Sequence, residues 1–377
     1  MRPSSSWLRR RAFTTPSTFN RLKVSQSTAP LEPNSLMVGC APLASEHDAC
    51  EVVQTALDLG IVDFDTAPLY TQGNSERYLG AAVAKLSPED ADRVNIYTKC
   101  GRLLTTAKDH TTTVTNDYSF AGTLKSLHDS MARLGATGSQ RIHALRIHDP
   151  NDSVERRLDV DEIAQSLGTD SADKGMVAAL IEMRQTGQIN SIGIGMNTNV
   201  ETTTTSSPLG NLPPSLTDGV PAEVDRLLRG IPTNVPPLDE VLLAGGWTLL
   251  AQTGLASLTT CQQLGVNVSA AGIFSTGLLV GTKQYAYQQA PVAMVEHANR
   301  WEVLAQKYNQ SLPTLAIGFA RLPNCVTRIV VGCATKEEVL LNVQAAEKVH
   351  TIPFELWEEA WESGLLDASL KEQLEFC

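Results

Sequence analysis

The chain has 377 residues, of which 42% are hydrophobic and 19% charged, and its formal net charge is −11 at pH 7. This acidic balance argues against a general nucleic-acid binder, which would carry a basic face, and no apolar run approaches the roughly 20 residues of a membrane span. Seven cysteines without CxxC pairs or metal-like Cys/His spacing predict free thiols and no metal site. We therefore expect small molecules as partners.

The first thirty residues differ in composition from the rest of the chain. The segment MRPSSSWLRRRAFTTPSTFNRLKV carries six Arg or Lys, is rich in Ser and Thr, and precedes the first acidic residue, Glu32. This composition is typical of an organelle transit peptide, and we expect mitochondrial import ahead of plastid import. The alternative is a disordered basic tail of a cytoplasmic protein. In either case we predict that residues 1–30 lie outside the fold and that residues 31–377 form a single domain.

Beyond this tail, short apolar runs alternate with segments of helical periodicity. The first run, SLMVGCAPL, precedes a segment in which five apolar residues repeat at helical spacing before Gly60: Ala49, Val52, Val53, Ala56 and Leu57. Seven further runs follow, at 60–65, 93–100, 141–149, 189–197, 239–245, 265–274 and 326–333. Helical candidates such as 120–136 and 176–187 separate them.

Eight buried strands, each followed by a helical candidate, predict an α/β fold, namely a closed (β/α)8 TIM barrel. Two stretches predict insertions in the loops after strands 4 and 5: VERRLDVDEIAQSLGTDSADKG, and a region rich in Thr, Ser, Pro and Gly at about 200–237. We interpret the second as a loop rather than a lid. An open doubly wound sheet is the alternative fold, although no GxGxxG follows the first strand.

A barrel places its working residues at the C-terminal ends of its strands, and four ionisable side chains occupy such positions. Asp65 ends the second predicted strand, Tyr70 lies in the loop beyond it, Lys99 ends the third strand and His148 the fourth. A buried ammonium would favour the phenolate form of a nearby tyrosine, whose ordinary pKa is about 10. We expect Asp65 to hold Lys99, Lys99 to act on Tyr70, and His148 to orient a substrate oxygen or relay a proton.

Taken singly, each of these residues has a structural explanation. Asp65 could cap a loop, Tyr70 could be a packing residue, Lys99 could be a solvated strand end, and His148 could be a core histidine. Their joint occurrence at three consecutive strand ends favours a catalytic site.

The motifs DTAPLY with SERYLG, TKC, IHDPND, GQINSIGIGMN and VVGCATKEEVLLNV resemble those of the aldo-keto reductase superfamily. The resemblance is to the aldose 1-dehydrogenase branch, which includes D-threo-aldose, L-fucose, L-galactose and D-arabinose dehydrogenases, and it runs from about Ser35 to near Trp361. It implies that Asp65, Tyr70, Lys99 and His148 form the family's catalytic tetrad, with Tyr70 as the general acid/base.

The same resemblance implies a nicotinamide cofactor. Asn197 would hold the nicotinamide amide, Phe274 would stack on the ring, and residues Ser275 to Gly277 would follow the pyrophosphate. In the motif GCATKEEVLLN, Thr335 is a predicted helix N-cap, and Glu338 completes a capping box. We also expect Asn342 to contact the cofactor. Where many NADP-using relatives carry Arg, this chain has Glu338, whose carboxylate would repel a 2′-phosphate. We therefore expect NAD, although Lys336 leaves NADP open.

The predicted function is transfer of hydride between a nicotinamide and C1 of an aldose, giving the aldonolactone. An NADPH-dependent reductase of aldehydes such as pyridoxal is one alternative, and a nicotinamide-binding regulatory protein with little turnover is another. The expected partner is a sugar or aldehyde, and the expected state is a monomer or weak homodimer. The segment AGGWT departs from the branch pattern AGRYT, so Gly246 and Trp247 put the choice of sugar in doubt.

Overall fold

The computed structural model describes residues 21–106, 112–135, 142–149, 175–197, 238–285 and 288–377. Its centre is a closed barrel of eight parallel strands, in the order β10-β13-β2-β3-β4-β7-β8-β9. The strands are β2 (Leu36–Gly39), β3 (Asp63–Asp65), β4 (Asn95–Cys100), β7 (Ile142–His148), β8 (Ser191–Asn197), β9 (Glu240–Ala244), β10 (Asn267–Ala271) and β13 (Val326–Gly332). Each lies within one of the eight predicted runs, so the predicted TIM barrel is confirmed.

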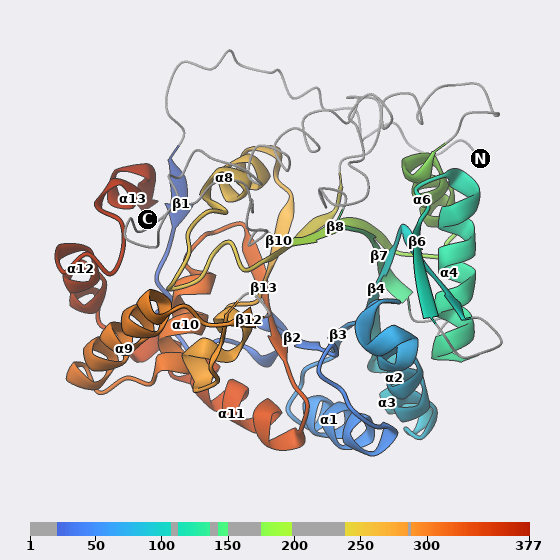
Figure 1. Cartoon of the computed structure of the whole chain (residues 1–377), viewed down its shortest axis with the longest axis horizontal. Coiled ribbons are helices and arrows are strands. Elements are labelled where there is room, and N and C mark those ends of the chain that lie inside the picture. The colour runs from blue at the N-terminus through green and yellow to red at the C-terminus, as the bar shows by residue number, and fades with distance from the viewer. Residues whose placement is uncertain (1–20, 107–111, 136–141, 150–174, 198–237, 286–287) are drawn as a thin grey trace, which may run out of the picture.

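Helices surround this barrel (Figure 1). They are α1 (Glu46–Asp58), α2 (Asn74–Ala84), α3 (Pro88–Arg93), α4 (Phe120–Leu134), α6 (Met176–Gln185), α8 (Leu255–Leu264), α9 (Val292–Lys307), α10 (Leu312–Arg321), α11 (Lys336–Glu347), α12 (Phe354–Glu362) and α13 (Ala368–Gln373). Helix α1 shows why such segments fold: the Ser45 side chain caps its N-terminus, and its buried residues are the five that repeat at helical spacing in the sequence.

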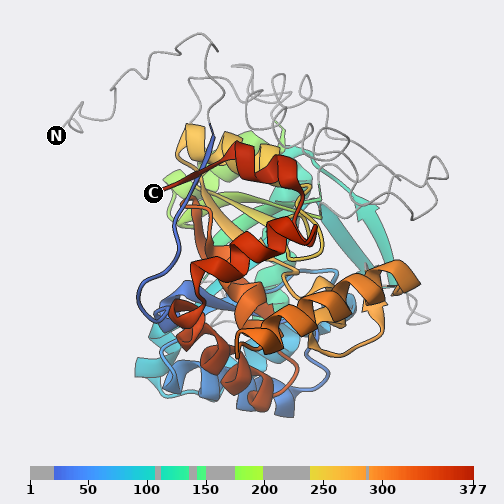
Figure 2. The same cartoon turned by 90° about the vertical axis from the view of Figure 1, so that its left-hand side faces the viewer.

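The N-terminal part of the fold begins earlier than the sequence predicted. Leu22–Val24 forms a short strand, β1, that pairs in parallel with β14 (Leu374–Phe376) near the C-terminus. Leu22 and Val24 are fully buried, and Figure 2 shows β1, in blue, running beside the C-terminal end of the chain. The expected boundary at residue 30 is therefore wrong for residues 22–24, because they bury apolar side chains against a segment some 350 residues away.

Two small hairpins accompany the barrel. The hairpin β5 (Arg102–Thr106) and β6 (Thr112–Asn116) follows β4 directly and lies beside α4 (Figure 1). A second pair, β11 (Gln284–Tyr285) and β12 (Gln288–Gln289), follows β10. The predicted insertions after strands 4 and 5 lie outside the described residues. None of the helices in the described part of the chain combines the length and hydropathy needed to cross a bilayer.

Candidate active site

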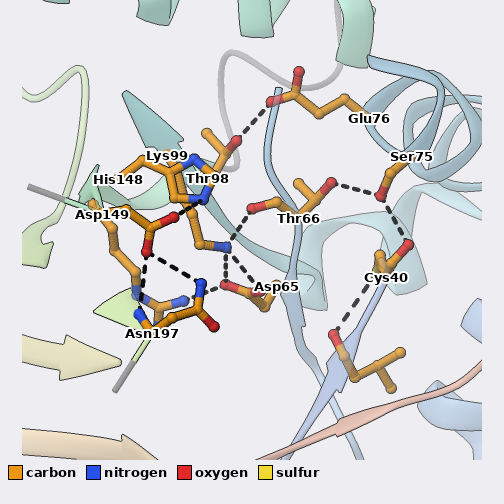
Figure 3. Close-up of polar contacts among 12 residues, drawn as sticks. Cys40, Asp65, Thr66, Ser75, Glu76, Thr98, Lys99, His148, Asp149 and Asn197 are labelled. Carbon is orange, nitrogen blue, oxygen red and sulfur yellow. Dashed lines mark hydrogen bonds and ion pairs between the residues drawn. The ribbon is translucent and has the colours of Figure 1, made fainter. Parts of the chain in front are cut away.

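The centre of the site is a buried ion pair between β3 and β4. The Lys99 ammonium lies 2.9 Å from each carboxylate oxygen of Asp65 and 2.9 Å from the backbone oxygen of Thr66 (Figure 3). Burial lowers the pKa of Lys99 from its ordinary value, while the Asp65 carboxylate opposes this effect. Three oxygen acceptors around one ammonium fix its position, as the sequence analysis expected of Asp65.

Tyr70 begins a short 3-10 turn, η2 (Tyr70–Gly73), that leaves the barrel after β3. The Lys99 Nζ atom lies 4.5 Å from the centre of the Tyr70 ring. Thr71 and Gln72 adopt positive φ angles of 46° and 55°, and Gly73 one of 85°. Such a turn is held by its surroundings rather than by local preference, and it keeps the half-buried Tyr70 over the ammonium.

His148 closes the group from the end of β7. It is only 6% exposed, and its ring meets the Tyr70 ring edge-on at a centroid distance of 6.2 Å. Burial, together with the positive charges of Lys99 and Arg102, holds the pKa of His148 well below its ordinary value. The imidazole is therefore neutral near pH 7. Its Nδ1 atom is buried without a hydrogen-bond partner among the described residues.

Residues of the motif SERYLG, in α2, form hydrogen bonds to residues next to Asp65 and Lys99. The Ser75 hydroxyl donates to the backbone oxygen of Cys40 at 2.9 Å and lies 2.8 Å from the Thr66 hydroxyl. The fully buried Glu76 carboxylate accepts from the Thr98 hydroxyl at 2.6 Å and from Arg133 Nε at 2.5 Å. Through these bonds α2 is attached to the backbone beside Asp65 and Lys99 (Figure 3).

Gly80 in the same motif permits a close helix contact. A Cβ atom at this position would lie 2.3 Å from the backbone oxygen of Leu134, at the end of α4. Only glycine allows the two helices to approach so closely. The polar residues of SERYLG thus position the strand ends, and its glycine positions α2 against α4.

Asn197, the predicted nicotinamide residue, is held by an aspartate that the sequence analysis did not select. Its backbone N–H and its Nδ2 atom both donate to Asp149 Oδ1, at 3.1 and 3.3 Å. The other oxygen of Asp149 lies 3.5 Å from His148 Nε2 and 3.4 Å from Arg102 Nη2. Asp149 has a φ of 41°, and it links His148 of β7 to Asn197 of β8 (Figure 3).

The predicted pyrophosphate segment follows β10 as a turn of unusual backbone. Phe274 lies three residues beyond the end of β10, not at the strand end that the sequence suggested, and it is half-buried against the core. Ser275, Thr276 and Gly277 have φ angles of 50°, 58° and 97°. A Cβ atom at Gly277 would approach Thr282 Oγ1 to 2.6 Å. The N–H groups of Ser275 and Gly277 donate to the backbone oxygens of Gly272 and Phe274 at 2.9 and 3.0 Å, so the turn is held by its own hydrogen bonds.

Helix α11 starts at the end of the last barrel strand, where barrels commonly bind phosphate. The Thr335 hydroxyl accepts the N–H of Glu338 at 3.4 Å, which confirms Thr335 as the N-cap. The Glu338 carboxylate accepts the N–H of Ala334 at 2.6 Å, so it stays at the helix start. Lys336 instead points to α1, where its ammonium lies 2.6 Å from Glu51.

Asn342 is the predicted cofactor residue with the least support. It is 8% exposed, and its Nδ2 atom donates to the Cys333 sulfur at 3.4 Å. This bond ties α11 to the end of β13, which is a packing role.

Comparisons with known proteins agree with this geometry. The model of the aldo/keto reductase family matches residues 37–216. A pyridoxal 4-dehydrogenase from Microbacterium luteolum is 28% identical over 88% of this chain and 94% of its own length. A D-threo-aldose 1-dehydrogenase from a Pseudomonas species is also 28% identical, over 85% and 89%. An L-galactose dehydrogenase from Arabidopsis thaliana is 23% identical, over 85% and 87%.

The chain is similar in sequence to the aldo-keto reductases. Solved structures agree on the fold: a glycerol dehydrogenase from Gluconobacter oxydans has a TM-score of 0.61 at 19% identity, covering 93% of this chain and 96% of its own. An aldo-keto reductase from Bacillus halodurans has a TM-score of 0.60 at 19% identity, covering 89% and 96%. Members of this family are oxidoreductases that bind NAD or NADP.

Two further charged residues of the site, Arg146 and Glu240, are not indicated by the strand-end pattern of the sequence. Arg146 and Glu240 are buried inside the barrel, and Arg146 contacts Asp65 Oδ1 directly at 2.5 Å. Arg146 was visible as a charge between apolar residues of a buried strand. Its partner was not, because Glu240 lies 94 positions away.

Trp247 does not reach the mouth of the barrel. Its side chain is 1% exposed, stacks on Phe319 at a centroid distance of 4.9 Å, and donates its indole N–H to the backbone oxygen of Phe319 at 3.1 Å. The replacement of the Tyr of the branch pattern by Trp247 therefore changes packing in the core and not the lining of the barrel mouth. No cluster of potential metal ligands occurs among the described residues.

Two buried histidines and one half-buried histidine make the stability of the protein dependent on pH. Burial lowers the pKa of His143, His148 and His297, whereas the unfolded chain protonates histidine near pH 6.5. Below that pH the unfolded state binds more protons, so we expect the free energy of unfolding to fall by up to about 1.4 kcal/mol per pH unit for each histidine. Thermal unfolding between pH 7.5 and 5 measures this slope.

The variant His148→Gln should have a smaller slope than the wild type, and His47→Gln, at an exposed position, should keep the wild-type slope. Equal slopes in all three proteins would contradict this account of His148.

Proposed function

We propose that this protein is an NAD-dependent aldose 1-dehydrogenase that oxidises the cyclic hemiacetal carbon of a sugar to the lactone. The observation that carries the proposal is the Lys99 ammonium, which is fixed by Asp65 and Thr66 and lies 4.5 Å from the centre of the Tyr70 ring. An ammonium so placed favours the phenolate of Tyr70 over the phenol. A phenolate available near neutral pH is a general base for an alcohol.

In the oxidative direction, Tyr70 accepts the proton of the C1 hydroxyl while the C1–H bond breaks and the C1–O bond becomes a carbonyl. Lys99 stabilises the phenolate before this transfer, and Asp65 keeps the ammonium in place. Neutral His148 contacts the same substrate oxygen and leaves the proton to Tyr70. Bound NAD supplies the hydride acceptor. In the reverse direction Tyr70 protonates the oxygen of a carbonyl.

The residues proposed to hold NAD lie around the same mouth. Asn197 would bind the nicotinamide amide from its position against Asp149, and Phe274 would pack on the nicotinamide ring. The start of α11 would receive the phosphates, because a helix N-terminus provides backbone N–H groups where a barrel commonly binds anions, and the turn of residues 275–277 would lie along the pyrophosphate.

A second substrate deserves testing because one relative is named a pyridoxal 4-dehydrogenase. Pyridoxal carries a hydroxymethyl group beside its aldehyde and can close to a cyclic hemiacetal. That form presents the same C–H and O–H pair as the anomeric carbon of a sugar, so Tyr70 and Lys99 would act on both. The two candidates therefore differ in the fit of the substrate and not in the chemistry.

The direct test is the absorbance of reduced nicotinamide when the purified protein meets aldoses or pyridoxal with NAD or NADP. The proposal expects reduction of NAD by at least one aldose, with a lactone as product. Reduction by pyridoxal alone would assign the second candidate. Oxidation of NADPH by aldehydes without any sugar oxidation would overturn the proposal, and tight nucleotide binding without turnover would indicate a regulatory protein.

The choice of NAD can be tested at Glu338. Its carboxylate stands at the start of α11, where it would repel a 2′-phosphate and accept hydrogen bonds from a ribose diol. In Glu338→Arg we expect the ratio of kcat/KM for NADP to that for NAD to rise about tenfold to a hundredfold, the equivalent of one charge-assisted hydrogen bond.

Glu337→Arg is the matched control, since Glu337 is exposed in the same helical turn and the substitution makes the same change of charge. It should alter the ratio far less. Equal ratios in the wild type and Glu338→Arg would remove Glu338 from the choice of cofactor.

A further inference from the structure

The catalytic lysine belongs to a layer of residues that crosses four adjacent strands. Lys99 of β4 is in register with Arg146 of β7, Arg146 with Gly193 of β8, and Gly193 with Glu240 of β9. Three of these four positions carry charged side chains inside the barrel, and all three are buried. The interior at this level is therefore ionic rather than apolar.

Strand β8 contributes glycines that leave room for these side chains. A Cβ atom at Gly193 would lie 3.0 Å from the Cγ atoms of both Arg146 and Glu240. A Cβ atom at Gly195 would lie 3.2 Å from Lys99 Cε. The segment GIG in β8 thus allows Arg146 and Glu240 to meet across a strand that has no side chain between them.

The guanidinium of Arg146 joins two carboxylates. Its Nε and Nη2 atoms donate to the two oxygens of Glu240 at 2.8 and 3.0 Å, which is a bidentate pair. Its Nη1 atom donates to Asp65 Oδ1, one of the two oxygens that Lys99 contacts. Burial alone would lower the pKa of Arg146, but Glu240 and Asp65 outweigh burial and raise it. Arg146 is therefore a permanent cation.

Asp65 is consequently shared by two cations. If Lys99 were its only partner, the carboxylate would cancel most of the positive charge that faces Tyr70. Because Arg146 takes part of that negative charge, more of the Lys99 charge acts on the phenol. Arg146 also restricts Asp65 to one orientation, since it is itself fixed by Glu240.

We propose that Arg146, anchored by Glu240, is a positioning residue that shares Asp65 with Lys99 and thereby strengthens the positive charge acting on Tyr70. This inference rests on the proposed role of Tyr70 as the general acid/base. It adds two charged residues, Arg146 of β7 and Glu240 of β9, to the four residues of the tetrad.

Other ionisable groups face the same centre and are left unchanged by the test. They are Cys40 after β2, Tyr97 of β4, whose ring centre lies 4.7 Å from the Arg146 guanidinium, Arg102 of β5, and His148 and Asp149 at the end of β7. Burial raises the pKa of the Cys40 thiol well above its ordinary value, and His148 is neutral. Neither group therefore changes charge between pH 6 and 8.

Two variants should move the Tyr70 pKa in opposite directions. The double variant Arg146→Met with Glu240→Met keeps the net charge but removes the nearer cation, so the Tyr70 pKa should rise by about half a unit or more. Glu240→Gln removes only the more distant anion, so the Tyr70 pKa should fall. If Arg146 only held the structure together, the two variants would not shift the Tyr70 pKa in opposite directions.

The first readout requires no substrate. Ultraviolet difference titration of each protein against the same protein carrying Tyr70→Phe isolates the ionisation of Tyr70 from that of the other tyrosines. The expected order of pKa is Glu240→Gln below wild type, and wild type below the double variant. An unchanged Tyr70 pKa in either variant that folds would overturn the proposal.

A matched control is the ion pair of Asp63, at the start of β3, with Arg328 of β13, whose atoms lie 2.6 Å apart. Asp63 also accepts hydrogen bonds from Asn95 and Tyr97. The double variant Arg328→Met with Asp63→Asn should leave the Tyr70 pKa unchanged even if its melting temperature falls. A shift equal to that of the Arg146 variant would assign the effect to loss of packing and overturn the proposal.

The second readout separates this proposal from the proposed function. Where the wild type oxidises an aldose, the acidic limb of its kcat/KM profile should move with the titrated Tyr70 pKa, while the KM for nucleotide stays the same. If the wild type turns over no substrate, the proposed function fails, yet the titration still decides the role of Arg146.

Discussion

Tyr70→Phe should lower kcat for sugar oxidation by at least about a hundredfold and up to ten-thousandfold, the range that a positioned acid/base contributes. The substitution removes one oxygen and keeps the ring beside Lys99 and His148. Because the hydroxyl is proposed to act on the substrate and not on the nucleotide, the dissociation constant for NAD should change little. Steady-state kinetics and fluorescence titration with NADH measure the two quantities separately.

Tyr78→Phe provides the matched control, because Tyr78 lies in α2 and packs against the core. It loses the same atom and should retain wild-type kcat. Activity within a few fold of wild type in Tyr70→Phe would exclude Tyr70 as the acid/base.

Lys99→Met should also abolish most of the turnover near neutral pH, by about a hundredfold or more. Without the ammonium, the Tyr70 phenol should ionise nearer to its ordinary pKa of about 10. We therefore expect activity to recover partly as the pH is raised toward that value. Asp65 would still be paired with Arg146, so the variant should fold, which circular dichroism and thermal unfolding can verify.

Lys125→Met is the control for the loss of a lysine, since Lys125 forms an exposed pair with Asp129 on α4. It should keep the wild-type rate and pH profile. If Lys99→Met lost activity by the same factor at every pH up to 10, Lys99 would act by holding the structure rather than by ionising Tyr70.

Most of the barrel could be predicted from the sequence because each strand is a short apolar run that ends in a polar or glycine-containing turn. The pairing of β1 with β14 could not be predicted in this way. Each of these strands has three residues, and its partner lies at the opposite end of the chain. Local periodicity carries no information about a contact at that separation, so the basic composition of the first thirty residues concealed the buried Leu22 and Val24.

The site was predictable to the extent that its residues stand at strand ends. Asp65 and His148 end their strands and Lys99 is the next-to-last residue of β4, so the barrel rule alone brings them together. Arg146 lies inside β7 and Glu240 begins β9, and their contact depends on the register of three strands and on Gly193 between them. Asp149 was hidden for a different reason, because its role depends on a positive φ angle and on Asn197 of the next strand.

The central claim is that Tyr70 and Lys99 serve a hydride transfer from the hemiacetal carbon of a sugar. It is tested most directly with an aldose that carries deuterium at C1, incubated with NAD and followed by mass spectrometry of the nucleotide. We predict NADH that contains one deuterium and a lactone that contains none, with no labelled NADH from the Tyr70→Phe variant. Reduced nucleotide without deuterium, or labelled NADH formed equally fast by Tyr70→Phe, would contradict the account.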